Sequence, residues 1–256
     1  MNLSQKFSLV LVVAMVCGCQ SGQFLDPNNP ISSVGHQGHI LDKDLKAASE
    51  SINERLSIGA ISSQQGADEL TKYARKLLDS DKDPRIARSE AWEYADVLIT
   101  AQRWAEADRV LRVALQNPTG EGRKVNDTLR LAHCEAELGD VESAIAITRS
   151  SFGATPHWKW PILYATYLEI VPAALAHSKG KELELADLVK DAIHQHERAL
   201  GDINNKSEKM WVVTRRIQID RAYHYMEQIY GSIDRPDLVK QTIAASKQQI
   251  EPLTAV

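Results

Sequence analysis

Apolar residues recur at intervals of three and four along most of the chain after residue 40. This spacing places them on one face of a helix, whereas a half-buried strand would alternate apolar and polar residues. No segment of comparable length alternates with period two. The helical stripes fall at residues 41–56, 70–78, 92–101, 107–115, 129–138, 144–147, 185–200 and 219–230. The pattern therefore predicts an all-α fold with about ten helices.

Turn-forming residues separate the stripes and divide the helices into hairpin pairs. The breaks at 83–84, 117–123, 139–140, 153–156, 180, 201–206 and 231–236 contain Gly, Pro, Asn or Asp, which favour turns. The chain has only 13 Gly and 9 Pro, too few for a barrel or sandwich of many short strands. Both observations favour helical hairpins.

The first 18 residues have a different pattern. A single charge at Lys6 is followed by mostly apolar residues from 7 to 16, and then by Cys17, Gly18 and Cys19. This is the layout of a bacterial export signal. The apolar segment is about half as long as a helix that crosses a bilayer, so a cleaved signal peptide over residues 1–18 fits it better than a retained anchor.

Residues 16–19, Val-Cys-Gly-Cys, resemble the lipobox of bacterial lipoproteins, in which an aliphatic residue and two small ones precede a lipidated cysteine. The resemblance implies that Cys19 is lipidated and begins the mature chain, which would then be held on the membrane. Cys17 departs from the usual Ala or Ser but is small enough to fit. Gln20 stands where Asp would imply inner-membrane retention, so we expect the outer membrane of the cell envelope, at its periplasmic face. An ordinary signal cleaved nearby is the alternative.

Residues 19–39 are expected to form a lipidated flexible tether, because they are rich in Pro, Asn, Gly and Ser and have no period. A helical domain over residues 40–252 would follow. The whole chain has a formal charge of -4, and the loss of Lys6 with the signal leaves -5. A charge of this sign gives no basic field for nucleic acid, so no nucleic-acid partner is expected.

Small residues recur within the helical region at a fixed interval. Ala95, Ala107 and Ala114 are separated by 12 and 7 residues, and Ala132, Ala144 and Ser151 have the same separations, 37 residues further on. Small side chains at a helix crossing let two backbones approach where Leu would hold them apart. The spacing therefore indicates two related hairpins.

These two units, over residues 89–156, resemble tetratricopeptide repeats. The resemblance implies an α-α superhelix of stacked hairpins, a solenoid that acts without enzymatic activity as a scaffold for a protein or peptide partner. The period of 37 residues exceeds the family's 34, and the extra residues fit in 117–124. Glu135 and Ala95 depart from the usual apolar residue and Gly. The flanking hairpins 41–80, 157–200 and 207–250 hardly carry the signature, and an unrelated helical bundle is the alternative.

The same resemblance implies which residues line a partner-binding groove. They are Trp92, Glu93, Asp96 and Ile99 from the first helix of one repeat, and Leu129, Arg130, His133 and Glu137 from that of the next. This mixture of charged, aromatic and aliphatic groups suits an extended peptide with a basic residue beside an apolar one. The alternative is that neighbouring helices of the chain cover the groove.

No catalytic motif or phosphate-binding loop is present, so neither an enzyme nor a cofactor is expected. An envelope enzyme acting on peptidoglycan or glycan stays open as an alternative; it would need a carboxylate such as Glu169 or Glu93 with a raised pKa. Trp158 and Trp160 are a candidate aromatic platform for a glycan or peptide, although large aromatic residues also fill cores.

No metal site is expected among the eight histidines. His194 and His196 are two residues apart on a predicted helix and therefore point to different sides. His36 and His39 in the tether would supply only two of the four ligands that structural zinc needs. In the helical region, Cys134 is expected to be a small buried residue, and Pro172 is expected to kink its helix.

Overall fold

The computed structural model describes residues 37–80, 86–116, 118–154, 160–177, 179–201 and 209–254. Most of these residues are helical and none of them forms a strand, which confirms the all-α prediction. The chain divides into two compact units, Met1–Pro118 and Thr119–Val256. Each unit is described by itself.

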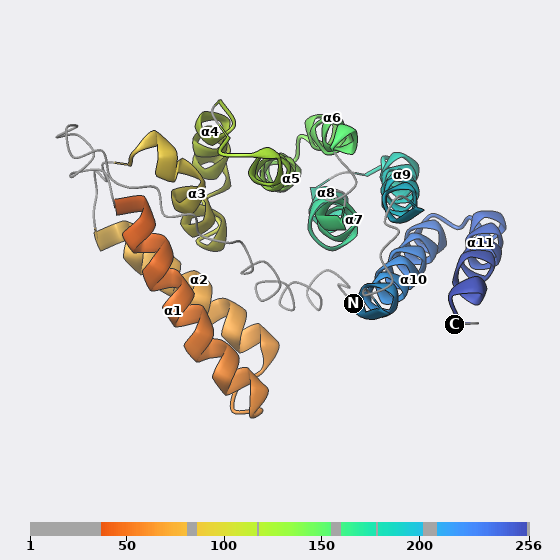
Figure 1. Ribbon diagram of the computed structural model, residues 1–256, viewed down its shortest axis with the longest axis horizontal. Helices are drawn as coiled ribbons and strands as arrows, with labels where there is room; N and C mark the ends of the chain where they lie inside the picture. Colours follow the sequence, from red (N-terminus) through yellow and green to blue (C-terminus); the bar gives the residue numbers. More distant parts are fainter. Residues whose placement is uncertain are drawn as a thin grey trace. The chain divides into compact units, whose positions relative to one another are not determined.

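Unit 1 contains two stacked hairpins. The first is formed by α1 (Gln37–Ser57) and α2 (Ser63–Ser80), and the second by α3 (Ala91–Thr100) and α4 (Trp104–Ala114), with a short 3-10 helix, η2 (Arg88–Glu90), before α3 (Figure 1). Both helices of the first hairpin pack on α3. The apolar stripes predicted from the sequence form the core between them, with Leu45, Leu70, Leu98 and Leu111 buried.

Unit 2 continues with hairpins that contact one another in sequence order. α5 (Glu121–Glu137) pairs with α6 (Val141–Ser150), which ends in a 3-10 turn, η3 (Ser151–Gly153). The next helical segment consists of α7 (Trp160–Ala165), a π-helical turn, η5 (Thr166–Ile170), and α8 (Val171–His177); it packs on both α5 and α9 (Glu182–Gly201). α10 (Lys209–Ser232) packs on α9 and forms the last hairpin with α11 (Pro236–Thr254) (Figure 1). Hairpins stacked on their neighbours are the architecture of a helical-repeat solenoid.

The small residues that define the two repeats are all buried. Ala95, Ala107, Ala132 and Ala144 have no exposed surface, and Ala114 and Ser151 expose 7% and 5% of theirs. Ser151 lies in η3, just beyond α6, and so differs slightly from its counterpart in α4. Burial at every one of these positions confirms the register of the repeats.

The two predicted repeats, α3–α4 and α5–α6, have turns with the same backbone hydrogen bonds. Each turn follows the Schellman pattern, in which one residue in the left-handed conformation ends the helix and two N–H groups donate back to its last carbonyls. The bonds are Arg103 N–H to Leu98 O and Gln102 N–H to Ile99 O between α3 and α4, and Asp140 N–H to Glu135 O and Gly139 N–H to Ala136 O between α5 and α6. Corresponding atoms are 37 residues apart.

A left-handed residue also follows the first helix of each flanking hairpin. In the two repeats these residues are Gln102, with φ 60°, and Gly139, with φ 86°. In the flanking hairpins they are Gly59 at 69°, Gly180 at 89° and Asp234 at 55°. Gly59 joins α1 to α2, Gly180 joins α8 to α9, and Asp234 joins α10 to α11. The flanking hairpins therefore share a turn geometry with the two repeats even though their sequences hardly share the signature.

Several helix boundaries differ from the predicted ones. α1 begins at Gln37, so residues 37–39 belong to a helix and not to the predicted tether 19–39. α5 begins within the predicted break 117–123, and α10 continues past Gly231. Packing on neighbouring helices outweighs a single Gly or polar residue at these ends. The predicted signal 1–18 and the rest of the predicted tether lie outside the described residues.

Candidate functional site

The predicted groove residues are divided between the two units. Trp92, Glu93, Asp96 and Ile99 lie on α3 in unit 1, and Leu129, Arg130, His133 and Glu137 lie on α5 in unit 2. The structure therefore brings together the members of each set but does not define one groove through both. The two faces have different surroundings.

In unit 1, α1 covers part of the predicted groove. Nδ1 of the His39 ring lies 2.8 Å from Oε1 of Glu93, and the Glu93 residue is only 8% exposed. Glu93 therefore pairs within the chain, and its assignment as an open groove residue is wrong. The physical reason is that α1 packs on α3, which is the covering by neighbouring helices that the sequence left open.

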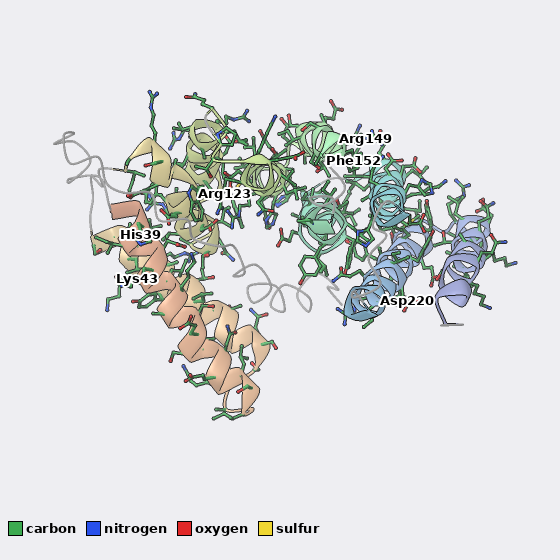
Figure 2. All side chains as sticks on the ribbon, viewed as in Figure 1. His39, Lys43, Arg123, Arg149, Phe152 and Asp220 are labelled. Carbon is green, nitrogen blue, oxygen red and sulfur yellow. The ribbon has the colours of Figure 1, made fainter. Side chains whose placement is uncertain are left out.

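The first turn of α1 is held by a second buried carboxylate, that of Glu90. The backbone N–H of His39 donates to Oε2 of Glu90 at 3.2 Å, where a negative charge meets the positive end of the helix dipole. A Cβ on Gly38 would lie 3.0 Å from Glu90 Cβ, so glycine permits this close approach. Glu90 explains why α1 begins earlier than predicted; Figure 2 labels His39 at this end of α1.

The other predicted residues on α3 are partly exposed. Nζ of Lys46 lies 5.8 Å from the centre of the Trp92 ring, a cation–π contact between α1 and α3. Asp96 and Ile99 are half-buried. The face of α3 therefore offers only a small accessible surface beside α1.

In unit 2, the buried Asp127 and two half-buried arginines of α5 form a charge cluster. Oδ1 of Asp127 lies 3.4 Å from Nη1 of Arg130 and 3.8 Å from Nη1 of Arg123. Burial raises the pKa of the Asp127 carboxyl, and the two arginines oppose that rise. Leu129 is also buried, so its predicted place in the groove is wrong. Arg130 is half-buried and is oriented by Asp127.

Two histidines contact the carboxylate of Glu137: His133 from the same helix, and His177 from α8, which thereby joins α8 to α5. Nε2 of His133 lies 3.5 Å from Oε1 of Glu137, and Nε2 of His177 lies 3.8 Å from Oε2. Hydrogen bonding from His133 lowers the pKa of the Glu137 carboxyl, with a smaller contribution from His177 and some opposition from burial. His177 was not among the predicted groove residues, because only the fold brings the end of α8 to α5.

Glu169 lies in the π-helical turn η5, near His133 and Arg130 of α5. Burial raises the pKa of its carboxyl, while the charges of His133 and Arg130 oppose the rise. The turn itself follows from Pro172, which has no N–H and whose ring would press on the carbonyl of Leu168 in a regular α-helix. In the wider turn, Val171 N–H donates to Thr166 O, five residues back. Such turns occur frequently at functional sites.

Two tyrosines and α10 extend the same face. The Tyr164 and Tyr167 rings make an edge-to-face contact with centres 6.2 Å apart, and the Tyr167 hydroxyl donates to Oε1 of Gln218 at 2.8 Å. Burial raises the pKa of the Tyr164 phenol; Glu169 adds to this rise and Arg221 of α10 opposes it. The charges of Glu169 and Arg221 therefore both act on the Tyr164 phenol.

We call this connected set the polar face of unit 2. Its members are Arg130, His133 and Glu137 of α5, Tyr164, Glu169 and His177 of the α7–α8 segment, and Arg221 of α10. The repeat register predicts the three residues on α5. It does not place Glu169 on this face, although the sequence carries one signal: Glu169 is the single charged residue between 160 and 176, three positions before a proline.

The remaining sequence candidates do not join this face. Cys19, Trp158 and the side chain of Trp160 lie outside the described residues. His196 is buried whereas His194 is exposed, so the two rings point to different sides as predicted. Cys134 is fully buried, also as predicted. Among the side chains that the structure describes, no group of three or more His, Cys, Asp and Glu is placed to hold a metal ion.

None of the helices that the structure describes is long and apolar enough to span a bilayer. Among solved structures, the chain is similar to a kinesin light chain from Podosopora anserina with nearly identical TPR-like repeats, at 12% sequence identity. The match covers 86% of this chain and 96% of that chain with a TM-score of 0.43. No family model matches the chain, and no curated protein matches it. Function is therefore inferred from the residues of this chain.

Proposed function

We propose that this chain is a lipid-anchored, non-enzymatic scaffold of the bacterial cell envelope, and that it binds a protein partner through an extended segment on the polar face of unit 2. The observation that carries the proposal is the polar face itself. Its charged side chains are partly exposed, and they come from three helical segments of unit 2, α5, α7–α8 and α10. Stacked hairpins use such surfaces to bind extended chains.

The proposed location depends on Cys19 and on the export signal before it. A lipid on Cys19 would hold the helical units at the outer membrane, on its periplasmic side, through the tether. Confinement to one membrane raises the effective concentration of a partner held there, so that a modest affinity is sufficient. No cofactor and no nucleic acid take part in this proposal.

The test is a cross-linked pull-down of the full chain from its native envelope. The test variant carries His177→Gln and Arg221→Gln, both on exposed residues of the polar face. The matched control carries Arg149→Gln and His194→Gln, which are also exposed but lie on α6 and α9 (Figure 2 labels Arg149). We expect one protein partner to be captured by the wild type and by the control, and much less by the test variant. Equal capture by both variants would exclude the polar face as the binding surface.

An envelope enzyme acting on glycan is the second candidate, and one observation favours it. Burial raises the pKa of Glu169, as a general acid requires. The reaction would also need a second carboxylate about 5 to 10 Å away. Release of soluble fragments from purified peptidoglycan by the wild type, and not by Glu169→Gln, would favour this candidate over the scaffold.

A further inference from the structure

Glu169 differs from Glu137, the other acidic residue of the polar face, in having no ion-pair partner among the described residues. Among the residues that the structure describes, its carboxylate has no hydrogen bond or ion pair, although Arg130 and His133 act on it through their charges. The cations near it already have acidic partners. Arg130 pairs with Asp127, and both His133 and His177 contact Glu137.

The position of this carboxylate is unusual for a residue with only a structural role. The segment from 160 to 176 is otherwise uncharged, and Ile162, Leu163, Ile170 and Val171 within it are fully buried. A carboxylate in such surroundings loses hydration and gains no partner in return, which destabilises the fold. Glu169 is nevertheless half-buried rather than enclosed, so a group from outside can reach it.

The charges around Glu169 favour a cation as that group. An anionic ligand would meet the carboxylates of Glu137 and Glu169, while the nearest cations are already engaged with acids. A cationic group would supply the partner that Glu169 lacks, in partly desolvated surroundings where such a pair is stronger than in water. The charge of Glu169 also acts on the phenol of Tyr164, whose pKa it helps to raise.

We propose that Glu169 binds a lysine or arginine side chain of the partner's extended segment, as the specificity contact of the polar face of unit 2. This inference rests on the proposed scaffold function and adds the chemistry of the ligand. It also gives a role to the π-helical turn, which places a carboxylate on an otherwise apolar segment.

The test begins with selection from a library of random displayed peptides, using the full chain in detergent as bait. We expect the selected peptides to share one basic position. A synthetic peptide of that sequence should lose affinity by about tenfold or more when its basic residue is replaced by norleucine, which keeps the methylene groups and removes the charge. Glu169→Gln should cause a similar loss, and the two changes together should cost little more than either alone.

Two controls separate binding from folding. Glu50→Gln makes the same change of charge at an exposed position of α1 and should leave the affinity unchanged. Glu169→Gln removes an unfavourable charge, so its melting temperature should equal or exceed that of the wild type. Loss of binding by a variant that is equally stable cannot be attributed to unfolding.

The possible failures are distinguishable. If no peptide is selected, both the scaffold function and this inference fail. If peptides bind but show no basic position, or if the losses from norleucine and Glu169→Gln simply add, only the inference about Glu169 fails. Selection of acidic peptides whose binding depends on Arg130 would likewise overturn it, because the ligand would then be an anion.

Discussion

The burial of Glu169 can be tested through the pH dependence of the free energy of unfolding. Its pKa is raised above the ordinary value of 4.5, chiefly by burial, so the folded state holds the proton more tightly than the unfolded state. Stability therefore falls as pH rises from about 4.5 through the raised pKa, and the loss is complete at higher pH. Below about 4.5 the group is protonated in both states and contributes no difference.

Glu169→Gln should therefore raise the melting temperature of the full chain at neutral pH, and the gain should vanish in acid. Thermal unfolding followed by circular dichroism from acidic to neutral pH measures both ends of this window. Glu50→Gln, at an exposed site, is the control and should change the melting temperature little at any pH. A gain from Glu169→Gln that persists unchanged in acid would mean that burial of the charge is not its cause.

The left-handed residues of the hairpin turns allow a second test, by exchange. Gly139 and Gln102 occupy the same position of two turns with the same hydrogen bonds. Gly139→Gln should lower the free energy of unfolding by about 1 to 2 kcal/mol, because a side chain is strained at positive φ. Gln102→Gly removes that strain and should be neutral or stabilising by up to about 1 kcal/mol. Urea unfolding measures both, and a similar loss from each would contradict the equivalence of the turns.

Some residues of the site could be predicted from sequence, and the exceptions have a physical cause. The repeat register identified Arg130, His133 and Glu137, because it fixes which side of a helix a residue occupies. It could not show that His39 would cover Glu93, because that depends on a hairpin whose sequence hardly resembles the repeat. His177 was missed for the same reason, since its contact with Glu137 spans two helices.

At the scale of elements, the small residues at helix crossings are the strongest link between sequence and packing. Ala107 on α4 is fully buried, whereas Ala105 on the same helix is exposed. Ala107→Leu should overpack the crossing and lower the free energy of unfolding by about 1 to 3 kcal/mol. Ala105→Leu has the same effect on helix propensity and should cost less than about 0.5 kcal/mol.

Urea unfolding of the two variants beside the wild type makes this comparison. Since both substitutions lie in α4 and add the same atoms, the difference between them reports burial alone. Equal stability of the two variants would contradict the predicted register of the repeats. A loss confined to Ala107→Leu would support it.

Helices themselves were predictable because their apolar spacing is local, but several of their ends were not. The start of α1 is set by Glu90, a residue 51 positions away from the His39 N–H that it accepts. The π-helical turn likewise had only Pro172 as a local signal, and a proline predicts a kink as readily as a wider turn. Contacts between elements decide such features, and apolar periodicity does not record them.

At the scale of the whole molecule, the proposed function joins a helical scaffold to a lipid anchor. Without the predicted signal the chain has a formal charge of -5, and a charge of this sign does not favour adsorption to anionic lipid. Attachment would therefore come from the acyl chains on Cys19, each adding about 0.8 kcal/mol per buried CH₂. This makes membrane binding separable from the fold, because a change at Cys19 alters no helix that the structure describes.

Two cysteines that lie two positions apart supply a matched pair for this prediction. Cys19→Ser should abolish incorporation of labelled palmitate and move the protein from the membrane fraction to the soluble fraction, because Ser has no sulfur to acylate. Cys17→Ser should leave both unchanged, since Ser is the residue usual at that position of the lipobox that it resembles. Labelling and fractionation of cells that express each variant make the measurement. If Cys19→Ser stayed in the membrane fraction without a label, a retained apolar segment or a membrane-bound partner would hold the protein there, and the lipid anchor would be wrong.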